Sequence, residues 1–255
     1  MLNESLSVGP WQWLVAAVGA LMVGVSKTGV AGLGILFVAA FAVVFPSTKQ
    51  ATGIVLPLLI LGDFVAVFSY RRHMLWSHLR RLFPWTAVGV VIGFVALGRF
   101  SDHAARLWIG SIILTMTALS YWLRWRRAAG ANLEAGVLQH WGVAAMIGVI
   151  AGFTTLIANA AGPLLAIYLV AMRLPKLEYV GTAAVFFCLM NLFKVPFMVD
   201  LGLVTAASLT FNLMLAPLVL IGAFAGRWLL TRINQRLFEE LALGLSVIAG
   251  LLLLR

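Results

Sequence analysis

The sequence predicts an all-α integral membrane protein, for three reasons. Of its 255 residues, 63% are hydrophobic and only 10% are charged, whereas a soluble domain is usually about 25% charged. The mean hydropathy is +1.05, so most of the surface is expected to face lipid. The apolar runs are about 20 residues long, which is the length of a membrane-spanning helix rather than of a barrel strand. In lipid, backbone groups pair internally only in helices or closed barrels, and these runs therefore predict helices.

Eight apolar segments follow one another along the chain. Two of them, 11–45 and 138–172, are too long for one span, because 35 helical residues measure about 52 Å and the hydrocarbon core about 30 Å. Glycines interrupt the first segment from Gly24 to Gly34, and glycines together with a proline interrupt the second from Gly152 to Pro163. These residues weaken a helix interior, so each long segment is predicted to be a hairpin of two shorter helices. The other six segments, each one helix long, are 50–69, 82–98, 106–123, 178–199, 205–226 and 236–254.

The two halves of the chain share a weak internal repeat. A shift of 128 positions matches a series of residues: Gly24 with Gly152, Ser26 with Thr154, Lys27 with Thr155, Gly34 with Gly162, Gly53 with Gly181, Asp63 with Asn191, and Gly98-Arg99 with Gly226-Arg227. Internal duplication is common in transporters. We therefore predict two transmembrane repeats, 1–127 and 128–255, each a broken helical hairpin followed by three transmembrane helices.

The charges in the loops predict that the repeats have opposite orientations. If 138–172 returns to the side on which it begins, 12 of the 18 cations lie on one side, which is then cytoplasmic because cytoplasmic loops carry an excess of Lys and Arg. Corresponding loops of the two halves then carry opposite charge bias, which indicates inverted-topology repeats. The cations concerned are Arg71, Arg72, Arg80, Arg81, Arg124, Arg126, Arg127, Arg173, Lys176, Arg227, Arg232 and Arg236.

Polar groups at the two helix breaks predict a site for an anion. Lys27, within the first break, is one of three charged residues inside the apolar spans, where an ionised side chain costs about 2.5–3.5 kcal/mol on insertion scales. Glycines free backbone N–H groups beside it, and hydroxyl groups add donors. The second break supplies hydroxyl and amide groups at the corresponding positions. We therefore predict one substrate site between the repeats, formed by Ser26, Lys27, Thr28, Gly29, Thr154, Thr155, Asn159 and Gly162.

Asp63, Asn191 and Lys194 are predicted to tune the charge of this site or to couple protons. Asp63 is either a counter-ion to one of the two lysines or a proton carrier, since a carboxylate beside a fixed cation stays ionised more readily. Structural roles remain as alternatives. The glycines can serve close helix packing, both lysines can extend to the membrane surface, and Asn191 can bond a neighbouring helix.

Several classes of function are not expected. The net charge of +10 lies mostly in short loops, which is typical of membrane topology and not of nucleic-acid binding. The single cysteine, Cys188, supports no disulfide framework or metal cluster, and no histidine is expected at membrane depth. No Walker A motif, HExxH motif or close pair of carboxylates lies in the spans. We therefore expect no enzyme activity, no metal and no cofactor.

Two groups of motifs resemble a known family. Gly24-Val25-Ser26-Lys27-Thr28-Gly29 followed by Gly32-Leu33-Gly34 resembles the first repeat motif of the sulfite exporter TauE/SafE family. Asn159-Ala160-Ala161-Gly162-Pro163 and Asn191-Leu192-Phe193-Lys194-Val195-Pro196 look like its second-repeat pattern, and the resemblance covers nearly the whole chain. Ala31 and Ala160-Ala161 stand where glycines are more usual in the family.

The resemblance implies an anion transporter of the bacterial inner membrane. Its substrate would be sulfite, a sulfonate such as sulfoacetate, or a related organosulfur or carboxylate anion. We therefore predict a secondary transporter that works by alternating access, with an anion channel as the alternative. The expected partners are the small anionic substrate and the lipid bilayer, and the sequence leaves proton coupling and a homodimer open.

Overall fold

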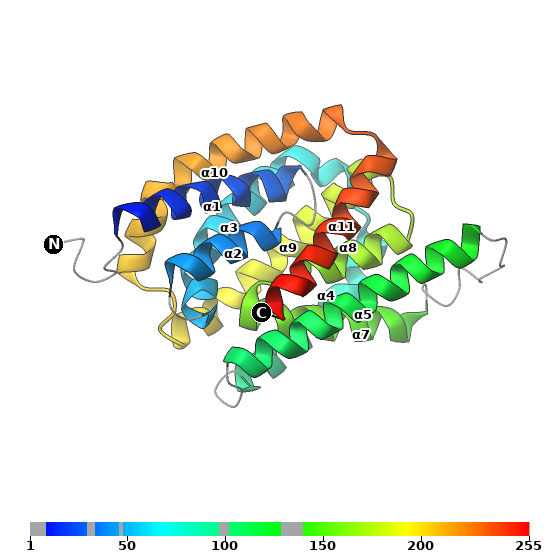
Figure 1. The fold of residues 1–255 in the computed structure, drawn as a ribbon, viewed down its shortest axis with the longest axis horizontal. Coiled ribbons are helices and arrows are strands. Elements are labelled where there is room, and N and C mark those ends of the chain that lie inside the picture. The colour runs from blue at the N-terminus through cyan, green and yellow to red at the C-terminus, as the bar shows by residue number, and fades with distance from the viewer. Residues whose placement is uncertain (1–8, 30–33, 46–47, 97–101, 129–139, 255) are drawn as a thin grey trace.

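The computed structural model describes residues 9–29, 34–45, 48–96, 102–128 and 140–254. Every regular element within these ranges is a helix, which confirms the all-α fold class. Figure 1 shows the helices, which in chain order are α1 (Pro10–Thr28), α2 (Gly34–Val44), α3 (Thr48–Tyr70), the 3-10 helix η1 (Arg71–His73), α4 (Trp76–Ala96), α5 (Asp102–Ala128), α7 (Trp141–Ala158), α8 (Ala161–Ala171), α9 (Lys176–Asp200), α10 (Ala206–Arg232) and α11 (Gln235–Leu253).

The chain is a multi-pass membrane protein. Five of the described helices are long and apolar enough to cross a membrane, namely α3 together with η1, α4, α7, α9 and α10. Their outer faces expose large apolar side chains, including Phe68 on α3 and Leu213 and Phe224 on α10. Lipid solvates such a surface, whereas soluble proteins rarely expose so much apolar area. The remaining two segments predicted as single spans, 106–123 and 236–254, lie within α5 and α11.

Each of the two long apolar segments consists of two helices, as predicted. Segment 11–45 contains α1 and α2, and segment 138–172 contains α7 and α8. The second helix of each hairpin has 11 residues, or about 16 Å, which is roughly half the thickness of the hydrocarbon core. Each long segment therefore combines a helix of spanning length with a half-length helix.

Asn159 ends α7 by adopting a left-handed backbone conformation, with φ 51°. Its backbone N–H donates to the carbonyl of Thr155, and the N–H of Ala160 donates to the carbonyl of Thr154. This pattern satisfies carbonyl groups at the helix end, and asparagine tolerates the left-handed region better than most residues. The chain then turns directly into α8. That helix is buried on nearly all sides, as expected for one that is apolar all round.

Glycines bring two pairs of helices together at backbone distance. A Cβ built on Gly24 of α1 would lie 2.5 Å from the backbone nitrogen of Ala223 in α10. One built on Gly152 of α7 would lie 2.8 Å from the backbone nitrogen of Val90 in α4. Small residues serve this purpose in membrane proteins, where van der Waals packing replaces the hydrophobic effect between helices. Each break therefore follows a helix that is held tightly against a long neighbour from the other half of the chain.

These contacts correct part of the predicted repeat. Four glycines each face the backbone of a partner helix: Gly222 faces Leu21, Gly226 faces Val25, Gly89 faces Val149, and Gly93 faces Phe153. The residues contacted on α1 and on α7 differ by 128 positions, as the predicted shift requires. The glycines that contact them, on α10 and on α4, differ by 133 positions. Gly226 thus corresponds to Gly93, and its predicted match with Gly98 is wrong. Gly98 and Arg99 themselves lie outside the described residues. The extra five residues shift the register after α9, so a constant offset fails there.

Gly24→Ala and Gly152→Ala should each destabilise the protein, because the added methyl group meets a partner backbone that cannot move aside. We expect a loss of about 1–3 kcal/mol for each variant and a lower apparent melting temperature in detergent. Gly244→Ala is the matched control, since a Cβ there meets no heavy atom within 4 Å. Equal melting temperatures for all three variants would contradict the close approach.

Candidate functional site

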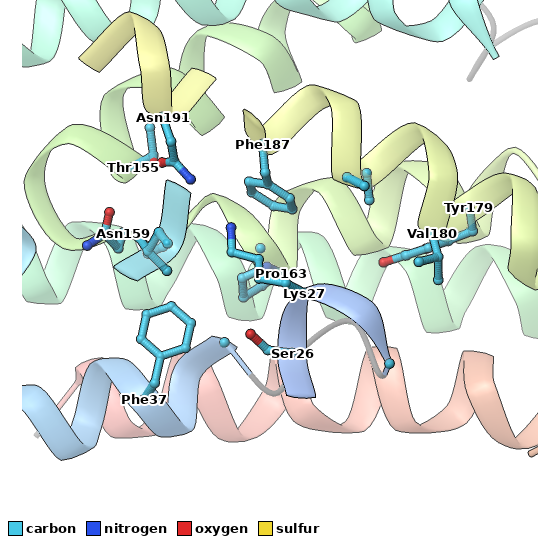
Figure 2. Close-up of a pocket in the computed structure, with 17 residues that line it drawn as sticks. Ser26, Lys27, Phe37, Thr155, Asn159, Pro163, Tyr179, Val180, Phe187 and Asn191 are labelled. Atoms are coloured by element: carbon cyan, nitrogen blue, oxygen red, sulfur yellow. The ribbon is translucent and has the colours of Figure 1, made fainter. Parts of the chain in front are cut away.

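The two helix breaks meet around one cavity of about 70 Å³ (Figure 2). A single water molecule needs about 10–15 Å³ by this measure, so the cavity has room for a small anion. Residues from α1, α2, α3, α7, α8 and α9 line it. Six of the eight residues predicted to bind substrate are among them: Ser26, Lys27, Gly29, Thr155, Asn159 and Gly162.

An ion pair joins Lys27 of α1 to Asp63 of α3, with 2.7 Å between Nζ and Oδ1. Asp63 is fully buried and Lys27 is 9% exposed, so the two charges depend on each other rather than on water. Gly62 lets the pair form, because a Cβ there would lie 3.0 Å from the Lys27 side chain. The Lys27 ammonium also lies 4.5 Å from the centre of the Phe187 ring, which is within range of a cation–π interaction. Of the two lysines considered, Lys27 is thus the partner of Asp63.

Asn191 of α9 completes this contact by donating a hydrogen bond of 2.6 Å from Nδ2 to Asp63 Oδ2. The two residues occupy corresponding positions in the two halves, 128 apart. Asn191 therefore bonds a neighbouring helix, which is one of the roles that the sequence left open. It also lines the cavity, so it links the buried carboxylate to the site.

Lys194 lies one helical turn further along α9 and is fully buried. Its ammonium donates to Asn159 Oδ1 at 2.7 Å and to the backbone oxygen and Oγ1 of Thr155, both at 3.3 Å. None of these acceptors is charged. The alternative in which Lys194 extends to the membrane surface is therefore wrong. Instead, Lys194 lies behind Thr155 and Asn159, which line the cavity, and its hydrogen bonds fix the orientation of these two side chains.

Thr28 and Thr154 do not line the cavity. The Thr28 hydroxyl donates to the carbonyl of Ala223 at 2.6 Å and so ties α1 to α10. The Thr154 hydroxyl lies 3.2 Å from the carbonyl of Ala151 in its own helix. Both side chains are fully buried. On each helix the threonine faces away from the cavity and its hydroxyl group bonds a backbone carbonyl, in α10 for Thr28 and in α7 itself for Thr154. The adjacent residues, Lys27 and Thr155, face the cavity.

The buried charges favour an anion. Lys27 and Asp63 neutralise each other, and Lys194 has no carboxylate partner in the described part of the chain. If all three groups are ionised, the region carries one net positive charge. A charge in surroundings of low dielectric acts over a longer distance than in water. An anion that enters the cavity therefore meets a favourable field from Lys194, even though this side chain does not contact the cavity.

Sequence reasoning missed the apolar part of the lining. Gly34 could have been found, because the shift of 128 places it on Gly162. The α9 residues gave no such signal, since apolar side chains at helical spacing are equally typical of packing. Among the ranges that the structure describes, no group of three His, Cys, Asp or Glu side chains could hold a metal ion. The missed residues are Gly34, Phe37, Leu59, Ala160, Pro163, Tyr179, Val180, Ala183, Ala184 and Phe187.

Comparison with known proteins identifies one family. The family model described as Sulfite exporter TauE/SafE matches residues 15–253, nearly the whole chain. No curated protein and no solved structure matches the chain significantly.

The ion pair predicts a specific pattern of stability. Lys27→Met or Asp63→Asn should each lower the free energy of unfolding by about 3–5 kcal/mol, because each leaves one buried charge without a partner. The double variant Lys27→Met/Asp63→Asn removes both charges and should recover most of that loss. Thermal unfolding of the four proteins in detergent gives the coupling energy. Additive losses in the double variant would show that the two side chains do not interact.

Proposed function

Because the chain belongs to the sulfite exporter TauE/SafE family of membrane transporters, we propose that it is a secondary transporter that moves a small anion by alternating access across the bacterial inner membrane. The substrate is sulfite, a sulfonate such as sulfoacetate, or a related organosulfur or carboxylate anion. The chain is a transporter and not an enzyme. The observation that carries this proposal is the cavity between the two helix breaks, which is lined by Lys27 and has the Lys194 ammonium held behind Thr155 and Asn159.

Lys27 is the group that meets the substrate. Its ammonium lies in the cavity but is paired with Asp63, so an entering anion competes with the carboxylate for the same cation. The competition is balanced if Asp63 takes up a proton when the anion binds. Asn191 already donates to the other oxygen of Asp63 and can hold that side chain in place in either protonation state. This exchange would couple substrate binding to proton binding.

Alternating access requires two halves that can rock against each other, and the helix directions support this. The residue numbers of the contacting positions increase in the same direction along α1 and α10, and likewise along α4 and α7. The two helices of each pair are therefore parallel. Helix α3 runs parallel to α10, because Asn212 bonds Ile54 and Val219 approaches Gly62. Spanning helices α3 and α4 are joined by only five residues, three of which form η1, and must therefore run in opposite directions. It follows that α1 and α7 are antiparallel, as two inverted repeats require.

The basic loops lie close together at one end, which supports the orientation predicted from the loop charges. Lys176 at the start of α9 donates to the carbonyls of Leu230 at 3.0 Å and Ile233 at 2.5 Å, at the end of α10. Gly181 in the first turns of α9 packs against the backbone of Tyr70 at the start of the Arg71–Arg72 loop. Loops rich in Lys and Arg favour the cytoplasm. We therefore assign this end to the cytoplasmic side.

Transport in proteoliposomes tests the role of Lys27, with sulfite and sulfoacetate as probes. The loss of a charge-assisted hydrogen bond of about 1.5–3 kcal/mol should lower transport by the folded double variant Lys27→Met/Asp63→Asn about 10–100-fold. The variant Lys27→Arg keeps the positive charge and should lose less transport activity than the double variant. Arg72→Ala, in the exposed part of η1, is the control. Unchanged transport in Lys27→Ala and Lys27→Arg would remove Lys27 from the site. Unitary currents would favour an anion channel over a carrier.

Cysteine labelling tests the inverted arrangement. Cys188, which is buried, is the single cysteine of the sequence. The variant Cys188→Ser therefore provides a background without thiols. In that background Trp76→Cys, at the start of α4, should react with an impermeant maleimide from the cytoplasmic side. Asp200→Cys, at the end of α9, should react only from the opposite side. Both positions are exposed. Labelling of both from one side would contradict the inverted repeats.

A further inference from the structure

The cavity is polar on one side and apolar on the other. Helix α9 runs along it and presents Asn191, then Phe187, then the pair Ala183 and Ala184, and then Val180. Figure 2 shows Asn191 with Thr155 and Asn159 on one side of Lys27, and Val180 with Tyr179 on the other. A ligand held at Lys27 therefore has several hydrogen-bonding groups on one side, and on the other side mainly hydrocarbon with the single hydroxyl group of Tyr179.

The hydrogen-bonding capacity of the lining is concentrated at the polar side. Thr155 accepts an N–H from Lys194 through its hydroxyl oxygen, which leaves the hydroxyl proton for a ligand. Asn191 uses one of its two amide hydrogens on Asp63, and Asn159 uses one on the carbonyl of Thr52. Each amide keeps a second hydrogen. Along the other side the α9 side chains of Ala184, Ala183 and Val180 that line the cavity are hydrocarbon, and Tyr179 beside them adds one hydroxyl group. The backbone N–H groups of this stretch are used within the helix.

A bare oxyanion suits only half of this cavity. Sulfite carries polar oxygens on every face except its lone pair, and oxygens turned toward the α9 wall would lose water without gaining donors. A second negative charge there, as on sulfoacetate, would be less favourable still. An alkyl group at the same place removes apolar surface from water and improves binding with each methylene.

We propose that the substrate is an organic monoanion, with a sulfonate or carboxylate group held at Lys27 and a short apolar tail lying along Phe187, Ala184 and Ala183. This inference rests on the proposed function and narrows its substrate class. It distinguishes an alkanesulfonate or a short fatty acid from sulfite and from dianions such as sulfoacetate.

Gly162, which lines the same cavity, limits the size of the ligand. A Cβ built there meets no heavy atom within 4 Å, so the space beside this residue is open. Gly162 lies within the regular helix α8, and a side chain there enters the cavity without straining the backbone. Larger ligands are therefore lost before smaller ones when this position is filled. Its counterpart Gly34 also lines the cavity, but a Cβ there would lie 3.4 Å from the Phe37 ring.

Ligand-induced stabilisation of the purified full chain tests the proposal, since a ligand that binds the folded state raises its apparent melting temperature. The probes are sulfite, sulfoacetate, methanesulfonate and propanesulfonate at equal ionic strength. Affinity should rise about fourfold for each added methylene, so propanesulfonate binds most tightly. Equal or tighter binding of sulfite or sulfoacetate would overturn the proposal. Failure of all four anions to bind or be transported would overturn the proposed function as well.

Variants of Gly162 provide the second arm of the experiment. Gly162→Val should weaken propanesulfonate about tenfold more than sulfite, because one badly placed methylene costs about that much in a fitted pocket. Gly162→Ala should show a smaller change in the same direction and covers the case in which the valine variant does not fold. Gly244→Ala, which also adds a methyl group in open space but does not line the cavity, is the control. Equal weakening of all anions by the Gly162 variants would show that Gly162 does not select tail size.

Discussion

Lys27 and Asp63 are buried where water can solvate neither charge, and the arrangement of the site depends on their contact. The pair ties the end of α1 to the middle of α3, and the Asn191 amide extends the link to α9. An ionised group left alone in this environment would be strongly destabilising. The three helices therefore hold one another in register through polar contacts, whereas apolar packing alone would tolerate rotation or sliding. The cavity lies beside this contact, near the end of α1, and both Lys27 and Asn191 line it.

The tight glycine interfaces explain why the two breaks stay open as a site. Helices α1 and α7 are each fixed against a long helix of the other half, with backbone nearly touching backbone. The half-length helices that follow them do not fill the space between these two rigid pairs. A transporter needs such a division, because rigid units that move as wholes can expose one site alternately to each side. In the proposed mechanism the breaks supply the ligand contacts and the glycine interfaces supply the rigidity.

The two buried lysines have different roles. Lys27 contacts the cavity and is paired with Asp63, whereas Lys194 has no carboxylate partner among the described residues and is held behind Thr155 and Asn159. The first can exchange one negative partner for another, so it suits direct contact with a substrate. The second fixes the polar side of the cavity by holding Thr155 and Asn159 in place.

The amino-acid sequence determined the features that depend on composition and on local backbone preference. Low charge content and long apolar runs required a helical membrane protein, and glycines with Pro163 and Asn159 placed the two breaks. The few charges in the spans identified Lys27, Asp63 and Lys194, because lipid penalises any charge without a function. Tertiary structure alone decided which lysine pairs with Asp63 and that Thr28 and Thr154 turn away from the cavity. It also decided that α4 and α10 correspond at an offset of 133. Those outcomes depend on the rotation and sliding of one helix against another, which a pattern within a single helix does not encode.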